Sequence, residues 1–210
     1  MIIAVDGPTA SGKGTISKAL AAHYGLPWLD TGLLYRAVGR QVALNGGNAD
    51  NSADAFAACD FPDELLDDPV LRDEATGGLA SRVSVHPEVR AALNKRQVDF
   101  ANQTGGAVLD GRDIGTVIAP HADVKLFVTA SAEIRAERRF KEMQRRGQVV
   151  DYETILADIR ARDKRDSERA DAPLKAAEDA HLLDTGNLTI GAAVQRAIAL
   201  VDAKIENRPV

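Results

Sequence analysis

The stretch from Gly7 to Thr15 limits the fold of this chain more than any other part of the sequence. It follows the apolar run at residues 2–6 and precedes a segment with helical spacing. A glycine-rich turn between a buried strand and a helix lets backbone N–H groups surround a polyphosphate, and a lysine adds a cation for its outer oxygens. The sequence therefore predicts a phosphate-binding loop (P-loop) made of Gly7, Pro8, Thr9, Ala10, Ser11, Gly12, Lys13, Gly14 and Thr15.

The hydroxyl group that usually follows the lysine of such a loop is displaced by one position. Gly14 stands directly after Lys13, so the hydroxyl comes from Thr15. Thr15 is a candidate ligand for Mg²⁺ bound with a polyphosphate. Asp30 and Asp110 are further candidates, because Mg²⁺ prefers oxygen ligands and binds some of them through water. The sequence leaves the choice among the three open.

Composition and charge favour a single domain that binds a small anionic ligand. A chain of 210 residues, 45% of them hydrophobic, is long enough to bury a core. The net charge of −5 opposes general nucleic-acid binding, yet residues 135–169 are rich in arginine. The single cysteine, Cys59, cannot form an internal disulfide, and the four histidines lack the spacing of metal ligands.

No segment has the pattern of a targeting or membrane-spanning sequence. The N-terminus lacks a basic leader with a long apolar stretch, and no run approaches the roughly 18 apolar residues of a membrane span. We therefore expect a cytoplasmic protein with no membrane partner and no nucleic-acid partner.

Five short apolar runs alternate with helical patterns along the chain. The runs occupy residues 2–6, 28–30, 107–109, 124–128 and 181–184. In the helical segments, Ser131, Asp151 and Thr189 are placed as N-caps and Pro87 suits a first helical position. This alternation predicts an α/β fold with a doubly wound five-stranded parallel sheet and helices on both faces.

Charged residues follow two of the predicted strands, where open α/β sheets bind their ligands. Arg36 lies in the second turn of the helix after residues 28–30, and Arg112 and Asp113 follow the strand at residues 107–109. These side chains could face a ligand in the crevice. Arg36 could equally be a solvated helix arginine, and the other two could belong to an ordinary charged turn.

The helix that begins after Asp151 changes character half-way along. Its apolar stripe ends at Ile159, and Arg162, Asp166 and Arg169 continue roughly the same side. A helix whose first half packs on the protein and whose second half overhangs a bound anion explains this change. The alternative is an intrahelical salt bridge between Arg162 and Asp166.

Taken together, these motifs resemble the bacterial cytidylate kinases, within the P-loop nucleoside monophosphate kinases. The resemblance spans nearly the whole chain. It rests on Gly-Lys-Gly-Thr at 12–15, Leu-Asp-Thr-Gly at 29–32 with Tyr35 and Arg36, Ser81 with residues 87–90, Asp-Gly-Arg-Asp at 110–113, and the spacing of the charged residues at 162, 166 and 169. It implies ATP as the phosphoryl donor, Mg²⁺ as the cofactor, and CMP or dCMP as the acceptor.

The resemblance also implies that one set of residues binds the acceptor. Arg36 and Arg112 look like ligands of its phosphate, and Ser81, Arg90 and Asp113 look like readers of cytosine. A carboxylate accepts a hydrogen bond from the cytosine amino group, which uracil lacks. The full predicted set is Thr31, Arg36, Ser81, Arg90, Arg112, Asp113, Arg162, Asp166 and Arg169, the last three being contacts to ribose and phosphate from a closing lid.

Phosphoryl transfer needs alignment and charge neutralisation more than a covalent nucleophile. An ammonium group, a magnesium ion and several guanidinium groups meet this need. The candidate catalytic residues are therefore Lys13, Arg112, Arg162 and Arg169.

We expect one nucleotide kinase domain over residues 1–210, acting as a monomer. Within it, residues 36–106 are expected to form the monophosphate-binding subregion and residues 145–172 a helical lid. The family usually has a small β-rich lobe between the positions of Arg36 and Ser81. Here residues 45–80 are short and acidic, without clear strands.

Three other activities compete with this interpretation. The loop at residues 7–13 also resembles that of tRNA dimethylallyl transferases, but those proteins place Ser or Thr directly after the lysine. They also need an RNA-binding surface, which an acidic chain poorly provides. A kinase for another nucleoside monophosphate, such as UMP, is a closer alternative, and a catalytically silent nucleotide sensor is a third.

Overall fold

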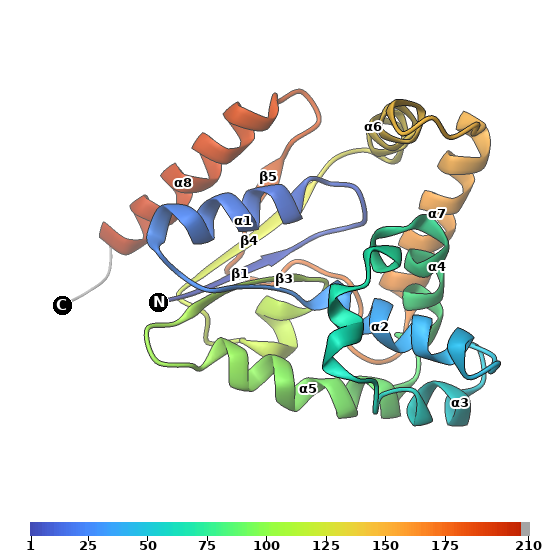
Figure 1. Cartoon of the computed structure of the whole chain (residues 1–210). Helices are drawn as coiled ribbons and strands as arrows, with labels where there is room; N and C mark the ends of the chain where they lie inside the picture. The colour runs from blue at the N-terminus through green and yellow to red at the C-terminus, as the bar shows by residue number, and fades with distance from the viewer. Residues whose placement is uncertain (207–210) are drawn as a thin grey trace.

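The computed structural model describes residues 1–206 and contains a five-stranded parallel sheet (Figure 1). The last four residues of the expected domain, 207–210, lie outside the described part. The strands run in the spatial order β2-β3-β1-β4-β5, and each neighbouring pair is parallel. Their bounds are β1 Ile2–Asp6, β2 Trp28–Asp30, β3 Ala107–Gly111, β4 Val124–Thr129 and β5 His181–Asp184.

Helices cover both faces of this sheet. On one face, α1 (Lys13–Tyr24) and α8 (Ile190–Glu206) bury Leu20 and Val201 against the strands. On the other face lie α5 (Pro87–Ala101) and a short π-helical turn, η3 (Ile114–Ile118). The predicted doubly wound α/β fold is confirmed. Because β1 is central, the loop after it opens at the same edge as the exits of β2 and β3.

A second core lies beside this edge. It is built by α2 (Thr31–Leu44), α3 (Ser52–Ala57), the 3₁₀ helices η1 (Asp63–Asp67) and η2 (Pro69–Arg72), and α4 (Glu74–Val83). These elements bury Leu34, Val38, Leu71 and Val83 together. The stretch at residues 45–80 thus contains helices and no strand, and Figure 1 shows it grouped around α2.

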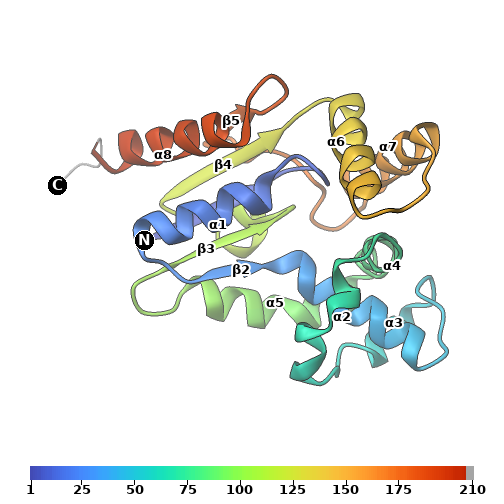
Figure 2. The same cartoon turned by 45° about the horizontal axis from the view of Figure 1, so that its top comes forward.

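The arginine-rich region forms a pair of packed helices. They are α6 (Ala132–Arg145) and α7 (Tyr152–Glu168), and they share a small core of Ala136, Ile155, Leu156 and Ile159. Figure 2 shows the pair beyond the carboxyl end of β4, across from α4. The carboxyl edge of the sheet is therefore flanked by α4 on one side and by α6 and α7 on the other.

The local signals for helix starts are confirmed. The Ser131 hydroxyl accepts a hydrogen bond from the N–H of Ile134 at 3.3 Å. The Asp151 carboxylate accepts from the N–H of Thr154 at 2.9 Å, and Thr189 caps α8 in the same manner at 3.2 Å. Each side chain satisfies a first-turn amide that has no partner within its helix.

Two predicted boundaries were wrong. Strand β3 continues through Gly111 instead of ending at residue 109, because Asp110 stays paired in register with Val5 and Asp30. Helix α7 ends at Glu168, so Arg169 lies just beyond it with extended backbone, φ −61° and ψ 141°. Arg169 therefore reaches the carboxyl edge of the sheet from the segment after the helix, not from the helix face.

Within residues 1–206, we find no helix that combines the length and the apolar character needed to cross a membrane.

Candidate active site

The P-loop joins the end of β1 to the start of α1, as predicted. Gly7 adopts φ +154°, and a Cβ there would lie 2.0 Å from the carbonyl oxygen of Val128. Gly12 precedes the helix in the left-handed conformation, with φ +88°. Both positions therefore require glycine. The structure places all the predicted ATP-binding residues, 7–15, in this loop and the first turn of α1.

Lys13 lies half-buried among charged groups at the base of the loop. Burial and the neighbouring Arg112 lower the pKa of its ammonium group to about 8, while Asp110 and Asp30 oppose this change. The two carboxylates stand side by side because Asp30 and Asp110 are register partners at the ends of β2 and β3. Burial and the Asp30 charge raise the pKa of Asp110 to about 6. Because these two carboxylates repel each other, the carboxyl edge of the sheet at Asp30 and Asp110 can accommodate a further positive charge.

The oxygen groups near Lys13 suit a magnesium ion bound with a polyphosphate. Asp110 lies close to the first turn of α1, with its Oδ2 3.9 Å from where a Cβ of Gly14 would stand. It also accepts a hydrogen bond from the Trp28 indole at 2.9 Å. Among residues 1–206, no three His, Cys, Asp or Glu side chains are grouped to hold a metal by themselves. The residues present therefore fit a cation that is partly held by its nucleotide and by water.

A second cavity lies next to the exits of β2 and β3. Every residue of the predicted acceptor set except Arg36 lines it: Thr31, Ser81, Arg90, Arg112, Asp113, Arg162, Asp166 and Arg169. These residues come from α2, α4, α5, the turn after β3, α7 and the segment after α7. The structure thus brings together groups that are up to 138 residues apart, from Thr31 to Arg169.

Asp113 lies at the centre of the ion pairs on one side of this cavity. Arg90 donates to its Oδ2, and the Arg169 guanidinium lies 3.6 Å from its Oδ1. Arg90 also contacts the hydroxyl of Tyr35 at 3.3 Å and donates to the Asp171 carboxylate at 2.8 Å. We did not assign Asp171 from the sequence, because a lone carboxylate after a helix has no pattern that separates it from a solvated one.

A second group of charges in this cavity has an excess of guanidinium groups. Arg112 donates from Nε to Asp166 over 2.9 Å. Arg162 lies half-buried beside them, and its buried Nε has no hydrogen-bond partner among the described residues. Burial and the charge of Arg112 lower the pKa of Arg162 to about 10, although Asp166 opposes the change. A buried guanidinium nitrogen without a partner is costly unless an anion binds, so this group of residues is suited to bind a phosphate.

Arg36 lies at the rim of this group. Its Nη1 donates to the carbonyl oxygens of Leu71 at 2.7 Å and Asp73 at 2.9 Å. Its guanidinium also packs on Gly77, where a Cβ would stand 2.9 Å from Nη2. Burial lowers the pKa of Arg36, and its electrostatic neighbours include Asp30 and Arg112. The side chain is thus fixed by backbone carbonyls of the stretch at 45–80, and it is not a freely solvated arginine.

The arginines of α6 hold the surrounding elements together. Arg135 donates to the carbonyl oxygens of Ala130 at 2.9 Å and Thr9 at 3.1 Å, and it pairs with Asp163 of α7. Arg138 donates to the backbone and the hydroxyl of Thr185, after β5. These contacts link the P-loop, α7 and the β5 exit, so the positive charge of this helix is largely used within the fold.

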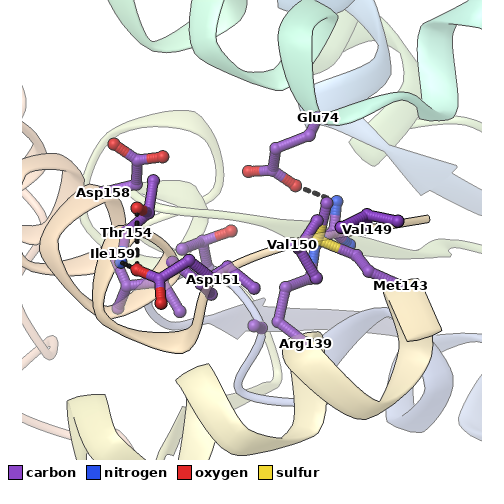
Figure 3. A pocket seen from close by; sticks show the side chains of 12 residues that line it. Glu74, Arg139, Met143, Val149, Val150, Asp151, Thr154, Asp158 and Ile159 are labelled. Carbon is purple, nitrogen blue, oxygen red and sulfur yellow. Dashed lines mark hydrogen bonds and ion pairs between the residues drawn. The ribbon is translucent and has the colours of Figure 1, made fainter.

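Figure 3 shows a further cavity, of about 260 Å³, between the P-loop tip, α4, α6 and α7. Glu74 and Arg139 form an ion pair across one side of it, joining the first turn of α4 to α6. Apolar side chains, among them Met143 and Val150, form its wall near the end of α6. The carboxyl edge of the sheet is thus open between the two helical groups, next to Thr9 and Ala10 of the P-loop.

The comparisons with known proteins agree with this geometry. The family model described as "Cytidylate kinase" matches residues 3–203. A cytidylate kinase from Xanthobacter autotrophicus is 57% identical, with 99% of this chain and 100% of that protein aligned. One from Rhodopseudomonas palustris is 54% identical, with 97% of each chain aligned.

Among solved structures, a gluconokinase from Sinorhizobium meliloti aligns with 98% of this chain and 94% of its own, with a TM-score of 0.53 and 17% identity. At that identity, the likeness concerns the fold alone. The family model and the curated relatives cover nearly the whole chain. The chain belongs to the cytidylate kinase family.

Proposed function

We propose that the protein transfers the γ-phosphoryl group of ATP to CMP or dCMP, giving ADP with CDP or dCDP. One observation carries the proposal. A cavity lined by the Asp113 carboxylate and by the guanidinium groups of Arg112 and Arg162 lies beside Lys13 of a P-loop. Such a cavity suits a nucleotide whose base meets the carboxylate and whose phosphate meets the arginines, with the donor phosphates close by.

The positive groups would supply most of the chemistry. Lys13 follows the outer phosphate oxygens of ATP, and Arg112, Arg162 and Arg169 neutralise charge between donor and acceptor. Mg²⁺ bound with ATP, held by the hydroxyl of Thr15 or the carboxylates of Asp30 and Asp110, would add charge neutralisation on the donor side. These groups align the acceptor phosphate oxygen with the γ-phosphorus and keep bulk water from competing as acceptor.

Base selection would depend on Asp113 and its partners. A carboxylate accepts a hydrogen bond from the cytosine amino group but opposes the carbonyl that uracil presents at the same position. Arg90 and Ser81, which line the same cavity, can meet the remaining acceptors of the base. Arg36 would contact the acceptor phosphate from the rim, where backbone carbonyls hold it.

We propose that residues 36–106 bind the monophosphate and that residues 145–172 act as a lid, which brings Arg162, Asp166 and Arg169 onto the substrate. We also propose that the protein acts as a monomer. Its substrates are small nucleotides available in the cytoplasm, so we propose that it works there.

An acceptor panel tests the proposal. Coupled ADP release is measured with CMP, dCMP, UMP, AMP and dTMP under saturating ATP and Mg²⁺. We expect a clear preference for the cytidine nucleotides, and a parallel Asp113→Asn variant should lose much of that preference. A wild-type enzyme that prefers UMP, or that shows no base preference, would overturn the assignment of the acceptor.

A further inference from the structure

Asp6, the last residue of β1, has a contact pattern that differs from that of an ordinary strand residue. Its carboxylate is buried, with 5% of the residue exposed, and faces η3. Oδ1 accepts a hydrogen bond from the N–H of Ile114 and Oδ2 accepts one from the N–H of Gly115, both at 2.8 Å. One side chain thus holds two consecutive amides that lie 108 and 109 residues away in the chain.

Those two amides are the first of η3 and need an outside partner. Within the turn, the carbonyl of Asp113 accepts from Val117 at 2.8 Å and from Ile118 at 3.3 Å. Ile114 and Gly115 precede these donors, so no earlier turn supplies a carbonyl for them. Left unpaired in a buried position, each amide would carry a desolvation cost. The Asp6 carboxylate satisfies both.

The residue at the N-cap position of this turn is Asp113, the proposed reader of the base. An aspartate at an N-cap usually bonds the first amides of its own helix through its side chain. Asp113 makes no such bond. Its carboxylate points instead to Arg90 and Arg169 in the acceptor cavity. Asp6 of β1 therefore caps this turn in place of Asp113.

We propose that Asp6 is a positioning residue for base selection: it caps the turn after β3 in place of Asp113 and thereby leaves the Asp113 carboxylate available to the acceptor base. This inference depends on the proposed function, since it assigns Asp6 a part in reading cytosine. Asp6 itself makes no contact with the cavity. It acts through the turn that carries the base-reading carboxylate.

The main-chain contacts around Asp6 indicate that its carboxylate is needed for the turn after β3 and not for the shape of the P-loop. The backbone of Asp6 is held by register partners on both sides, Gly111 in β3 and Phe127 in β4. Gly7, the next residue, is fixed by its close approach to the carbonyl of Val128. The start of the P-loop is therefore anchored by the main chain, and removal of the Asp6 carboxylate should leave it in place. The element that loses its contact when the carboxylate is removed is η3.

The test compares Asp6→Asn with the wild type at pH 7.5, using CMP and UMP as acceptors. Asparagine is similar in shape but has one acceptor oxygen, so one of the two amides loses its partner and meets an N–H₂ group. Asp113 then has an amide to cap. We expect the ratio of kcat/KM for CMP to that for UMP to fall about tenfold, the effect of one such hydrogen bond. The KM for ATP should stay within about twofold of the wild-type value.

A matched control is Asp123→Asn. The Asp123 carboxylate accepts from the N–H of Ile2 at 2.6 Å, at the opposite end of β1. This variant also replaces a carboxylate that accepts from a backbone N–H, but it does so at the end of β1 opposite to Asp6. It should change the thermal midpoint without changing the CMP to UMP ratio. If Asp6→Asn behaves in the same way, Asp6 is only a structural residue and the proposal is wrong.

Two further measurements keep the proposal testable. In an Asp113→Asn background, adding Asp6→Asn should cause little further loss of base preference if Asp6 acts through Asp113; full additivity would contradict this.

If Asp6→Asn does not fold, Gly115→Ala replaces it. A Cβ at Gly115 would lie 3.2 Å from Lys125 Cδ and 3.4 Å from Asp6 Oδ2, so either the Lys125 side chain or the turn must move by a few tenths of an ångström. An unchanged CMP to UMP ratio in that variant counts against the proposal, whereas a wild-type enzyme without base preference would refute the proposed function itself.

Discussion

Arg112 donates from its Nε to the Asp166 carboxylate over 2.9 Å, and this buried ion pair joins the turn after β3 to helix α7. The alternative role of Asp166 was an intrahelical ion pair with Arg162. Asp166 instead accepts its hydrogen bond from Arg112. Arg162 remains an electrostatic neighbour without a hydrogen bond to it. The pair therefore connects the proposed lid to the sheet, and it spaces two guanidinium groups that would otherwise repel each other.

We expect Asp166→Asn to destabilise the ligand-free protein. Burial raises the pKa of Asp166, but Arg112 and Arg162 outweigh this effect and hold it below its usual range. The ionised carboxylate thus stabilises the fold above about pH 4, and this contribution is lost as the pH falls through the lowered pKa. Loss of one charge from a buried pair costs about 3–5 kcal/mol. Urea unfolding at neutral pH measures the change. Added sulfate should recover more stability in the variant than in the wild type, and equal recovery would contradict this account.

Arg162→Met should separate stability from activity. The Nε of Arg162 is buried and has no partner among the described residues, whereas Asp166 keeps Arg112 when Arg162 is removed. Replacing this charge by an apolar side chain of similar length should leave the free energy of unfolding unchanged or raise it by about 1–2 kcal/mol. The kcat should fall by about 10²–10³, because charge in the transition state loses a partner. A large drop in the thermal midpoint would show that Arg162 is a structural residue.

The lowered pKa of Lys13 predicts how ATP binding depends on pH. Burial and Arg112 bring this pKa to about 8 in the ligand-free protein, and a bound polyphosphate would raise it. Above pH 8, ATP binding must therefore take up a proton. The KM for ATP should stay flat below about pH 8 and then rise by up to about tenfold per pH unit.

Equilibrium binding of a non-hydrolysable ATP analogue separates this effect from chemistry. A Lys13→Arg variant, whose guanidinium stays charged, should bind the analogue with little change between about pH 7 and 10. If wild type and variant show the same pH profile, the titrating group is not Lys13.

Much of the sheet and of the P-loop could be predicted because their signals are local. Each strand is a short apolar run, Ser131 and Asp151 cap helices three residues away, and glycines at fixed positions shape the phosphate loop. The resemblance then supplied the acceptor set, and the structure brings all of that set except Arg36 to one cavity. Their functional roles remain predictions.

What the sequence did not predict depends on contacts between distant segments. The two hydrogen bonds of Asp6 span more than 100 residues, and nothing near Asp6 in the chain indicates them. The end of α7 before Arg169 coincides with a contact to a distant segment, since the Arg169 guanidinium lies 3.6 Å from Oδ1 of Asp113. The helices at residues 45–80 are short, so periodicity could not identify them.

Two adjacent glycines of α4 offer a test of the Arg36 contact. A Cβ at Gly77 would lie 2.9 Å from Arg36 Nη2 and 3.2 Å from its Cζ, whereas a Cβ at Gly78 has no neighbour within 4 Å. Gly77→Ala must therefore displace the Arg36 guanidinium from its position, where it donates to the carbonyl oxygens of Leu71 and Asp73. If Arg36 binds the acceptor phosphate, the KM for CMP should rise about tenfold, since a small misplacement of a positioning group is costly.

Gly78→Ala is the matched control, because it makes the same change one residue away, where the added Cβ has no neighbour within 4 Å. It should leave the KM values for ATP and CMP unchanged. It should stabilise the protein by up to about 1 kcal/mol, because alanine favours helix more than glycine does. Steady-state kinetics with CMP and thermal unfolding of both variants complete the comparison. Equal kinetics for the two variants would mean that the position of Arg36 does not matter for the acceptor. A raised KM in Gly77→Ala alone would place Arg36 among the phosphate ligands.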